Sequence, residues 1–188
     1  IRETAPNAAP WLDAGAPAEQ AYIEFMGGHR LASRDDHLGR YFVMGETART
    51  ELKRATNELH AMFMHGTDYV LEHPDVLERF NLPAALLPRL RNSWQNRRTH
   101  NITARFDFAI SDKGLKVYEY NADSAGCHME CGLVQGRWAD HHGVKEGRDP
   151  GARLSEALAH AWRDSHVEGA LHILQDEDKE EDYHALYM

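Results

Sequence analysis

The chain has 188 residues, of which 42% are hydrophobic and 27% charged, and its formal net charge is −9 at pH 7. This length suffices for one domain with a substantial core, or for part of a larger domain. The negative charge argues against a nucleic-acid partner and leaves room for a cationic one. Because no run approaches the roughly 18 apolar residues of a membrane span, no membrane partner is expected either.

The ends of the chain and its cysteines add two expectations. The chain begins at Ile1 rather than Met and ends at Met188, directly after an apolar turn without a capping signal, so we expect a fragment of a longer protein. Its two cysteines are too few for a disulfide framework and predict a reducing, cytoplasmic setting. Cys127, His128 and Cys131 are close together, but the second ligand pair of a zinc site is missing at the usual spacing.

Helices dominate the prediction for the first hundred residues. Residues 1–20 hold three prolines and many alanines, which is typical of an extended linker. Residues 47–71 form the clearest helix, because apolar side chains recur every three or four residues and a proline follows its end. Residues 75–100 are predicted to form short helical pieces, since Pro83 and Pro88 interrupt them.

Strands and helices alternate in the second half of the chain. A hairpin over residues 105–121 is followed by an expected helix over 124–140, and the Asp-Pro pair at 149–150 predicts the start of another helix. Residues 170–174, ALHIL, have the pattern of a short buried strand, and a last helix is expected near Glu180. This order indicates a mixed α/β (α+β) fold with helices around a mainly antiparallel sheet.

The hairpin RFDFAISDKGLKVYEYN can be aligned from its turn. Gly114 stands at the third position of a three-residue loop, where a left-handed glycine commonly follows a type I turn. In the resulting register Asp107 lies opposite Glu119, and Arg105 lies opposite Asn121. The other face is mostly aromatic, which supports this register because a slip by one residue would mix the two sets.

The polar face of the hairpin predicts a site for phosphate and Mg²⁺. Asp107 opposite Glu119 is a like-charge pair, which is destabilising unless something neutralises it. Mg²⁺ takes carboxylate, water and phosphate oxygens, to which Asn121 can add a carbonyl, and the guanidinium of Arg105 suits a phosphate or a carboxylate. Two alternatives stay open: a solvated face on which Arg105 and Asp107 compensate each other, and a carboxyl with a raised pKa for acid–base catalysis.

Polar residues after the hairpin and near the end of the chain are further candidates. Ser124 is expected at the start of a helix, as a plain N-cap or also as part of an anion site. Cys127 would lie in the first turn of that helix, where we favour a buried or incidental thiol over an activated one. The acidic run QDEDKEED at residues 175–182 could bind a polyamine, or could simply complement a helix dipole.

The block RFDF…GLKVYEYNADSAGCHMECGLVQGRWA and the later stretch HILQDEDKEEDYHALYM resemble the glutathionylspermidine synthase and trypanothione synthetase family. The opening IRETAP resembles the region that joins this family's amidase domain to its synthetase domain. Family members are ATP-grasp ligases that join the glycine carboxylate of glutathione to an amine of spermidine or of glutathionylspermidine. ATP first phosphorylates the carboxylate, and the amine then attacks the acyl phosphate.

The resemblance implies a role for each polar residue of the hairpin. Asp107, Glu119 and Asn121 match the Mg²⁺ ligands of the family. Arg105 matches the catalytic arginine, which also contacts glutathione and stabilises negative charge as the acyl phosphate forms and reacts. Mg²⁺ is the implied cofactor, and ATP, glutathione and the polyamine are the implied substrates.

The resemblance extends to residues outside the hairpin. Ser124 matches a serine that contacts glutathione, and Glu180 and Glu181 match acids of the polyamine pocket. Gly126 differs from the family pattern, which leads us to expect a second serine at this position. The hydrogen bond that such a serine would make to glutathione is the one affected.

The resemblance also predicts the domain organisation. The nucleotide-binding half is missing, because the five lysines lie in no suitable setting and no GxxxxGK loop occurs. We therefore expect residues 1–20 to be a linker from an upstream amidase domain and residues 21–188 to be the first part of an ATP-grasp synthetase domain. This fragment alone should be inactive. The alternatives are a degenerate metal-binding module without ligase activity, another ATP-grasp peptide or amine ligase, and a hydrolase that uses the carboxylates.

Overall fold

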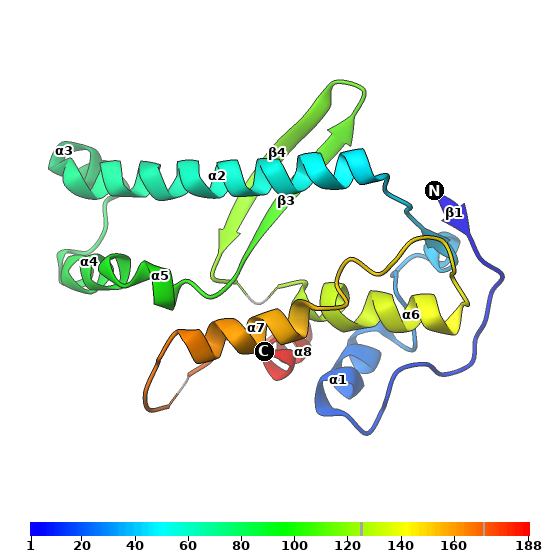
Figure 1. Cartoon of the computed structure of the whole chain (residues 1–188). Helices are drawn as coiled ribbons and strands as arrows, with labels where there is room; N and C mark the ends of the chain where they lie inside the picture. Colours follow the sequence, from blue (N-terminus) through cyan, green and yellow to red (C-terminus); the bar gives the residue numbers. More distant parts are fainter. Residues whose placement is uncertain (125, 171) are drawn as a thin grey trace. The chain divides into compact units, whose positions relative to one another are not determined.

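The computed structural model describes residues 1–124, 126–170 and 172–188 (Figure 1). Over these residues the chain forms helices and two small sheets, which confirms the mixed α and β class. The expected antiparallel pairing takes the form of two separate two-stranded sheets rather than one main sheet. These are β1 (Arg2–Glu3) with β2 (Arg40–Tyr41), and β3 (Ala104–Ser111) with β4 (Gly114–Ala122).

The helices account for most of the described chain. The longest, α2, spans Glu46–Glu72 and confirms the helix predicted over residues 47–71. The other α-helices are α1 (Pro17–Met26), α3 (Pro74–Leu77), α4 (Leu87–Gln95), α5 (Arg97–His100), α6 (Gln135–His141), α7 (Leu154–Asp164) and α8 (Lys179–Tyr187). Short turns of 3₁₀-helix are η1 (Asp35–His37), η2 (Glu78–Phe80) and η3 (Ala84–Leu86), and η4 (Glu130–Val134) is π-helical. Among the residues placed, no helix is both long and apolar enough to cross a membrane.

Contacts between residues divide the chain into two compact units. Unit 1 comprises residues 1–43, 102–105 and 122–188, and unit 2 comprises residues 44–101 and 106–121. The strands of the hairpin pass from one unit into the other. Each unit therefore contains part of the predicted site, and each is described by itself.

The core of unit 1 is formed by α1, α8 and the segment that follows the hairpin. Tyr22 of α1 and Tyr183 of α8 meet edge to face with ring centroids 5.1 Å apart, an arrangement that is favourable for aromatic pairs. Leu12, Met129 and Val134 complete the buried cluster. Burial of these side chains holds α8 against α1.

Part of residues 1–20, which composition predicts to be an extended linker, packs within unit 1. Leu12 is only 7% exposed, and α1 begins within the segment. The carboxylate of Glu19, 4% exposed, accepts hydrogen bonds from the Asp13 amide at 2.7 Å and from Arg137 Nη1 at 2.8 Å. Apolar burial and a paired buried charge thus fix the segment. That it leads in from an amidase domain stays a prediction.

Two predicted helix starts are wrong. The helix expected from residue 124 begins at His128, because the chain before it turns, with Cys127 in the left-handed region at φ +67°. The helix expected at 149–150 begins at Leu154 instead. Asp149 Oδ1 accepts a hydrogen bond from the Gly151 amide at 2.9 Å and so stabilises a turn rather than a helix end.

The buried strand predicted at residues 170–174 is also wrong for the residues that the structure describes, and Leu171 lies outside them. Ile173 is 48% exposed and Leu174 is 93% exposed. An apolar run forms a strand only beside a partner, and no strand within the described ranges pairs with it.

In unit 2, helix α2 packs on the aromatic face of the hairpin (Figure 1). The ring of Phe63 lies 6.0 Å from that of Phe106 and 4.9 Å from that of Tyr120, measured between centroids. Nearer the turn, Ile110 and Tyr118 are exposed. The predicted aromatic face is therefore confirmed for the half of the hairpin that α2 covers.

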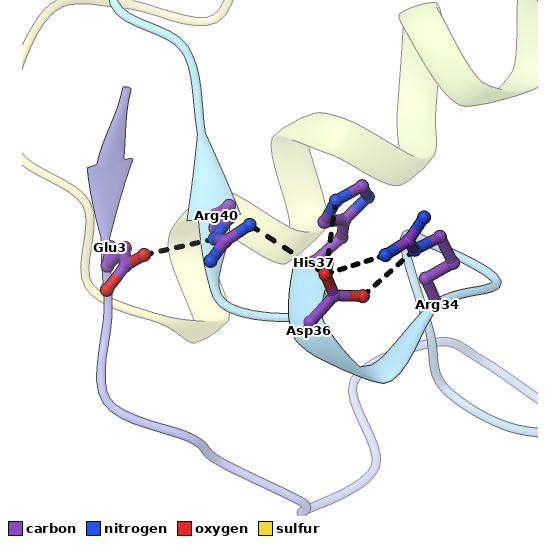
Figure 2. Close-up of polar contacts among 5 residues, drawn as sticks. All are labelled: Glu3, Arg34, Asp36, His37 and Arg40. Atoms are coloured by element: carbon purple, nitrogen blue, oxygen red, sulfur yellow. Dashed lines mark hydrogen bonds and ion pairs between the residues drawn. The ribbon is translucent and has the colours of Figure 1, made fainter.

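A network of charged side chains joins the first sheet to η1 in unit 1, as Figure 2 shows. Arg40 Nε donates to Glu3 Oε1 at 3.0 Å. Arg34 donates to both carboxylate oxygens of Asp36, at 3.0 and 2.9 Å. His37 Nε2 and Arg40 Nη1 lie 3.6 and 4.0 Å from Asp36 Oδ2. Asp36 is thus the shared acceptor of the network.

We expect this network to make part of the stability of unit 1 depend on pH. The Arg34 hydrogen bond holds the pKa of the Asp36 carboxyl below its ordinary value of 3.8. Because the pKa of Asp36 is lower in the folded state than in the unfolded state, the network stabilises the fold at pH values above the ordinary pKa. This contribution is lost as the pH falls through the folded-state pKa. Arg34→Gln should therefore raise the pKa of Asp36, measured by NMR titration, and lower the urea midpoint slightly at pH 7 but not in strong acid. An unchanged pKa of Asp36 would contradict the assignment.

Candidate functional site

The turn of the hairpin and one contact across its strands agree with the register that the sequence predicts. Gly114 has φ +96°, in the left-handed region expected at the third loop position. The rings of Phe106 and Tyr120 stack with centroids 4.2 Å apart and an interplanar angle of 9°. This is the contact expected of directly opposed residues in the predicted register. One residue further along, the same register sets Asp107 opposite Glu119 on the other face.

Unit 2 holds the three residues predicted to bind Mg²⁺. Asn121 Nδ2 donates to Glu119 Oε1 at 2.9 Å, as expected for residues two apart on one face of a strand. Asp107 is partly buried, and Glu119 is exposed. No cluster of three or more His, Cys, Asp or Glu side chains within the described residues could enclose a metal. Two carboxylates and an amide do fit Mg²⁺ held jointly with water and substrate phosphates.

Unit 1 holds the predicted arginine and serine, which the structure brings together at a tight bend. Arg105 Nη1 lies 3.5 Å from Cys127 Sγ, and Ser124 Oγ accepts a hydrogen bond from the Gly126 amide at 3.3 Å. A Cβ added at Gly126 would lie 2.8 Å from Arg105 Nη1 and 3.5 Å from Ser124 Oγ. The absence of a side chain at Gly126 therefore leaves room for the guanidinium.

The bend differs from the predicted helix start. Because the helix begins at His128, Ser124 is not its N-cap, and its hydroxyl stabilises the bend instead. Cys127 precedes the helix rather than lying in its first turn. Ala125, between them, lies outside the described residues. The pKa of the neighbouring Cys131 thiol is raised by burial and by the nearby Cys127, which disfavours a reactive thiolate at that position.

The acidic run ends in helix α8, where the structure supports the dipole interpretation. The Asp178 side chain caps α8 by accepting a hydrogen bond from the Glu180 amide at 2.8 Å. Glu180 and Glu181 are exposed in the first turn, where acids complement the helix dipole. Other residues of the run line a cavity of about 360 Å³: Gln175, Asp176, Glu177, Asp178, Lys179 and Asp182. The acids around this cavity could equally receive a cation.

Three residues of unit 1 that the sequence did not single out, two of them buried and one partly buried, form a hydrogen-bonded group that we call the Glu130 cluster. The Tyr183 hydroxyl donates to Glu130 Oε1 at 2.6 Å, and His184 Nε2 lies 3.4 Å from the same oxygen. Burial, followed by the bond to Glu130, raises the pKa of the Tyr183 phenol, so it stays protonated. His184 Cε1 lies 3.9 Å from the Cβ position at Gly126.

The Glu130 cluster connects α8 to the bend. The sequence indicated only the side of α8 on which His184 lies, because His184 follows Glu180 by four residues and Glu181 by three. The position of Glu130 could not be predicted, since it begins the π-helical turn η4. A π-helical turn shifts side chains out of the register that a 3.6-residue period gives.

A separate cavity of about 710 Å³ lies within unit 2, between α2, α4 and β4. Its lining is mainly apolar, and none of the predicted site residues contributes to it. Cavity volume therefore does not identify the polar site in this chain, and the arrangement of charged groups is the better guide.

Comparison with known proteins agrees with the motifs. Residues 26–188 match the family model described as "Glutathionylspermidine synthase preATP-grasp". The chain is 47% identical over 178 residues to the bifunctional glutathionylspermidine synthetase/amidase of Escherichia coli (strain K12). It is 37% identical over 184 residues to the trypanothione synthetase of Crithidia fasciculata, and 31% identical over 196 residues to the glutathionylspermidine synthase of the same organism.

The matches cover nearly all of this chain but only part of each relative. Each of the three alignments includes 95% of the chain. The chain spans 28% of the length of the first two relatives and 27% of the third. The comparisons thus apply to one region of much longer proteins.

Proposed function

Because the chain belongs to the glutathionylspermidine synthase preATP-grasp family, we propose that it is part of an ATP-dependent ligase. The full-length protein would join the glycine carboxylate of glutathione to an amine of spermidine or of glutathionylspermidine. The named relatives are a glutathionylspermidine synthetase/amidase, a trypanothione synthetase and a glutathionylspermidine synthase, which supports a ligase that acts on a polyamine and glutathione. An accompanying amidase activity and a cytoplasmic location are part of the proposal.

One observation carries the proposal within unit 1. The bend with Arg105 and Ser124, proposed to bind glutathione, lies beside helix α8, which carries Glu180 and Glu181, proposed to bind the polyamine. The bend approaches the helix where His184 Cε1 lies 3.9 Å from the position that a Cβ at Gly126 would occupy. Groups suited to a carboxylate and groups suited to an ammonium therefore lie on neighbouring elements, as an amide-forming site requires.

Arg105 is proposed to act on the reacting carboxylate. The γ-phosphoryl group of ATP is transferred to a carboxylate oxygen of glutathione, which gives an acyl phosphate and ADP. The guanidinium stabilises the negative charge of this group as it forms and reacts. The Ser124 hydroxyl, at the same bend, provides a hydrogen bond to glutathione.

Asp107, Glu119 and Asn121 are proposed to hold Mg²⁺. The ion, when bound, neutralises charge on the phosphates of ATP. The three side chains themselves provide oxygen ligands on one face of the hairpin, with the stacked rings of Phe106 and Tyr120 giving that face a rigid support.

The proposal is tested by measuring ADP release from the full-length protein. ADP should form only when ATP, Mg²⁺ and glutathione are all present, and an amide product should form when spermidine is added. A degenerate metal-binding module would release no ADP under any of these conditions, and a hydrolase would act without ATP.

The polyamine assignment makes a separate prediction. Replacing Glu180 and Glu181 together with Gln removes two negative charges and keeps the size of the side chains. We expect the KM for spermidine to rise about tenfold or more, because each lost contact with an ammonium weakens binding by about 1 kcal/mol, while the KM for glutathione changes little. Steady-state kinetics measures both values. Equal increases in the two KM values would count against a polyamine pocket on α8.

A further inference from the structure

The Glu130 cluster contains a buried titratable group that the proposed ligation has not yet used. His184 is only 5% exposed, and its Nε2 lies 3.4 Å from Glu130 Oε1. Glu130 Oε1 is held in turn by the Tyr183 hydroxyl at 2.6 Å. An imidazole whose orientation is fixed by a carboxylate, itself fixed by another group, is the usual arrangement of a histidine that transfers protons.

The carbon between the two ring nitrogens of His184 faces the bend. Three groups approach the Cβ position at Gly126: Arg105 Nη1 at 2.8 Å, Ser124 Oγ at 3.5 Å and His184 Cε1 at 3.9 Å. A cation, a hydroxyl and an imidazole thus converge on one point beside the Gly126 backbone. The first of these groups is proposed to act on the reacting carboxylate of glutathione and the second to bind glutathione, so His184 lies beside the proposed carboxylate site.

A purely structural role does not explain the cluster fully. Glu130 Oε2 is buried and has no hydrogen-bond partner among the residues that the structure places. Such an oxygen costs free energy, which a group retained only for stability would avoid. Glu130 also begins the π-helical turn η4, and such turns are frequent at functional sites.

We propose that His184, oriented by Glu130, is the catalytic residue that accepts a proton from the attacking amine. This inference rests on the proposed function. The amines of spermidine are ammonium ions at neutral pH and carry no free electron pair. With Nε2–H donated to Glu130, Nδ1 of His184 takes one proton from the ammonium, and Glu130 stabilises the imidazolium that results.

The bond changes then balance. The free electron pair of the amine nitrogen attacks the carbonyl carbon of the acyl phosphate and forms the C–N bond. The C–O bond to phosphate breaks, and phosphate leaves with the electron pair of that bond. The leaving phosphate also takes the second proton of the nitrogen. The imidazolium releases its proton to solvent, which returns His184 to its starting form.

The surroundings of His184 suit this role. Glu180 and Glu181 lie one turn earlier on α8, so an ammonium that they bind would be near the imidazole. Arg105 and Cys127 belong to the bend, and Glu130 belongs to η4. Glu130 fixes the orientation of the imidazole, so proton transfer to His184 depends on Glu130 remaining in place.

The test compares two nucleophiles in the full-length protein with ATP, Mg²⁺ and glutathione. Spermidine needs to lose a proton before attack, whereas hydroxylamine is largely neutral at pH 7 and traps an acyl phosphate as a hydroxamate. In His184→Gln, amide formation with spermidine should fall by about 10²-fold or more, while hydroxamate formation stays close to that of the wild type. Equal losses with the two nucleophiles would overturn the proposal, and so would an unchanged rate with spermidine.

A second variant and a control keep the test decisive if His184→Gln folds poorly. Glu130→Gln retains an acceptor for Tyr183 and should lower the spermidine rate selectively, by less than His184→Gln does. Tyr187→Phe removes the hydrogen bond to Ser155 Oγ at the other end of α8, and should leave the ratio of the two rates unchanged. If Tyr187→Phe lowered the ratio of the spermidine rate to the hydroxylamine rate as much as Glu130→Gln does, both effects would result from the docking of α8. That result would overturn the proposal. Failure of the wild type to release ADP with either nucleophile would instead refute the ligase function.

Discussion

Replacing Asp107 or Glu119 with Ala in the full-length protein should abolish ATP-dependent ligation. Each change removes one of the two carboxylates proposed to hold Mg²⁺, so the ion loses both an oxygen ligand and a neighbouring negative charge. The stabilisation that a bound metal gives a phosphoryl-transfer transition state is several kcal/mol, which corresponds to a rate loss of about 10³-fold or more.

The measurement is ADP release and amide formation at saturating ATP and glutathione. Asp112→Ala is the matched control, because Asp112 is also an acidic residue of the hairpin but lies in its turn. We expect that variant to keep its activity. Any amidase activity should persist in all three variants. Ligation at the wild-type rate in either Asp107→Ala or Glu119→Ala would refute the metal assignment.

Gly151→Ala should destabilise unit 1 more than any surface substitution. A Cβ at this buried position would overlap the carbonyl oxygen of Cys131 and lie 2.9 Å from Gln135 Nε2. The carbonyl belongs to the backbone of η4, so it cannot move aside without disturbing the π-helical turn. Overpacking against a fixed backbone costs about 3 kcal/mol or more, a large part of the stability of a typical domain.

Urea unfolding followed by fluorescence would measure this loss. Gly45→Ala is the control, because a Cβ there would meet no atom within 4 Å. We expect the midpoint of Gly151→Ala to fall well below that of Gly45→Ala. Equal midpoints would show that the turn at Gly151 moves freely, and would contradict the close approach to Cys131.

Local chemistry made much of the fold predictable. The apolar spacing around Leu59 and Phe63 gave α2 to within one residue at either end, because a long amphipathic helix needs no distant partner to be recognised. The hairpin followed from one glycine, since a three-residue loop ending in Gly114 leaves a single register that separates the polar face from the aromatic one.

What the sequence could not show depends on contacts between distant segments. Composition made residues 1–20 look like an extended linker, yet Glu19 is paired with Arg137, more than a hundred residues later. The apolar run that ends at Leu174 looked like a buried strand, but a strand forms only where another is available to pair with it.

For the candidate site, too, the residues that follow from local spacing could be predicted, and those that depend on distant contacts could not. Arg105 and Asp107 follow from the alternation of the hairpin and the like-charge pair that it creates. Their part in binding Mg²⁺ and phosphate stays a prediction. The sequence did not predict His184 or Glu130. His184 lies among ordinary helix residues, and the orientation of Glu130 depends on a π-helical turn, which the periodicity of the sequence does not predict.

The edge-to-face contact between Tyr22 and Tyr183 crosses the boundary of the region that the family model matches. The region that the family model matches starts at residue 26, after most of α1. The helix that carries Glu180 and His184 nevertheless rests on Tyr22, which lies before that start. The region that the family model matches is therefore shorter than the unit that folds, and a chain cut at residue 26 would lose one wall of the core that supports α8.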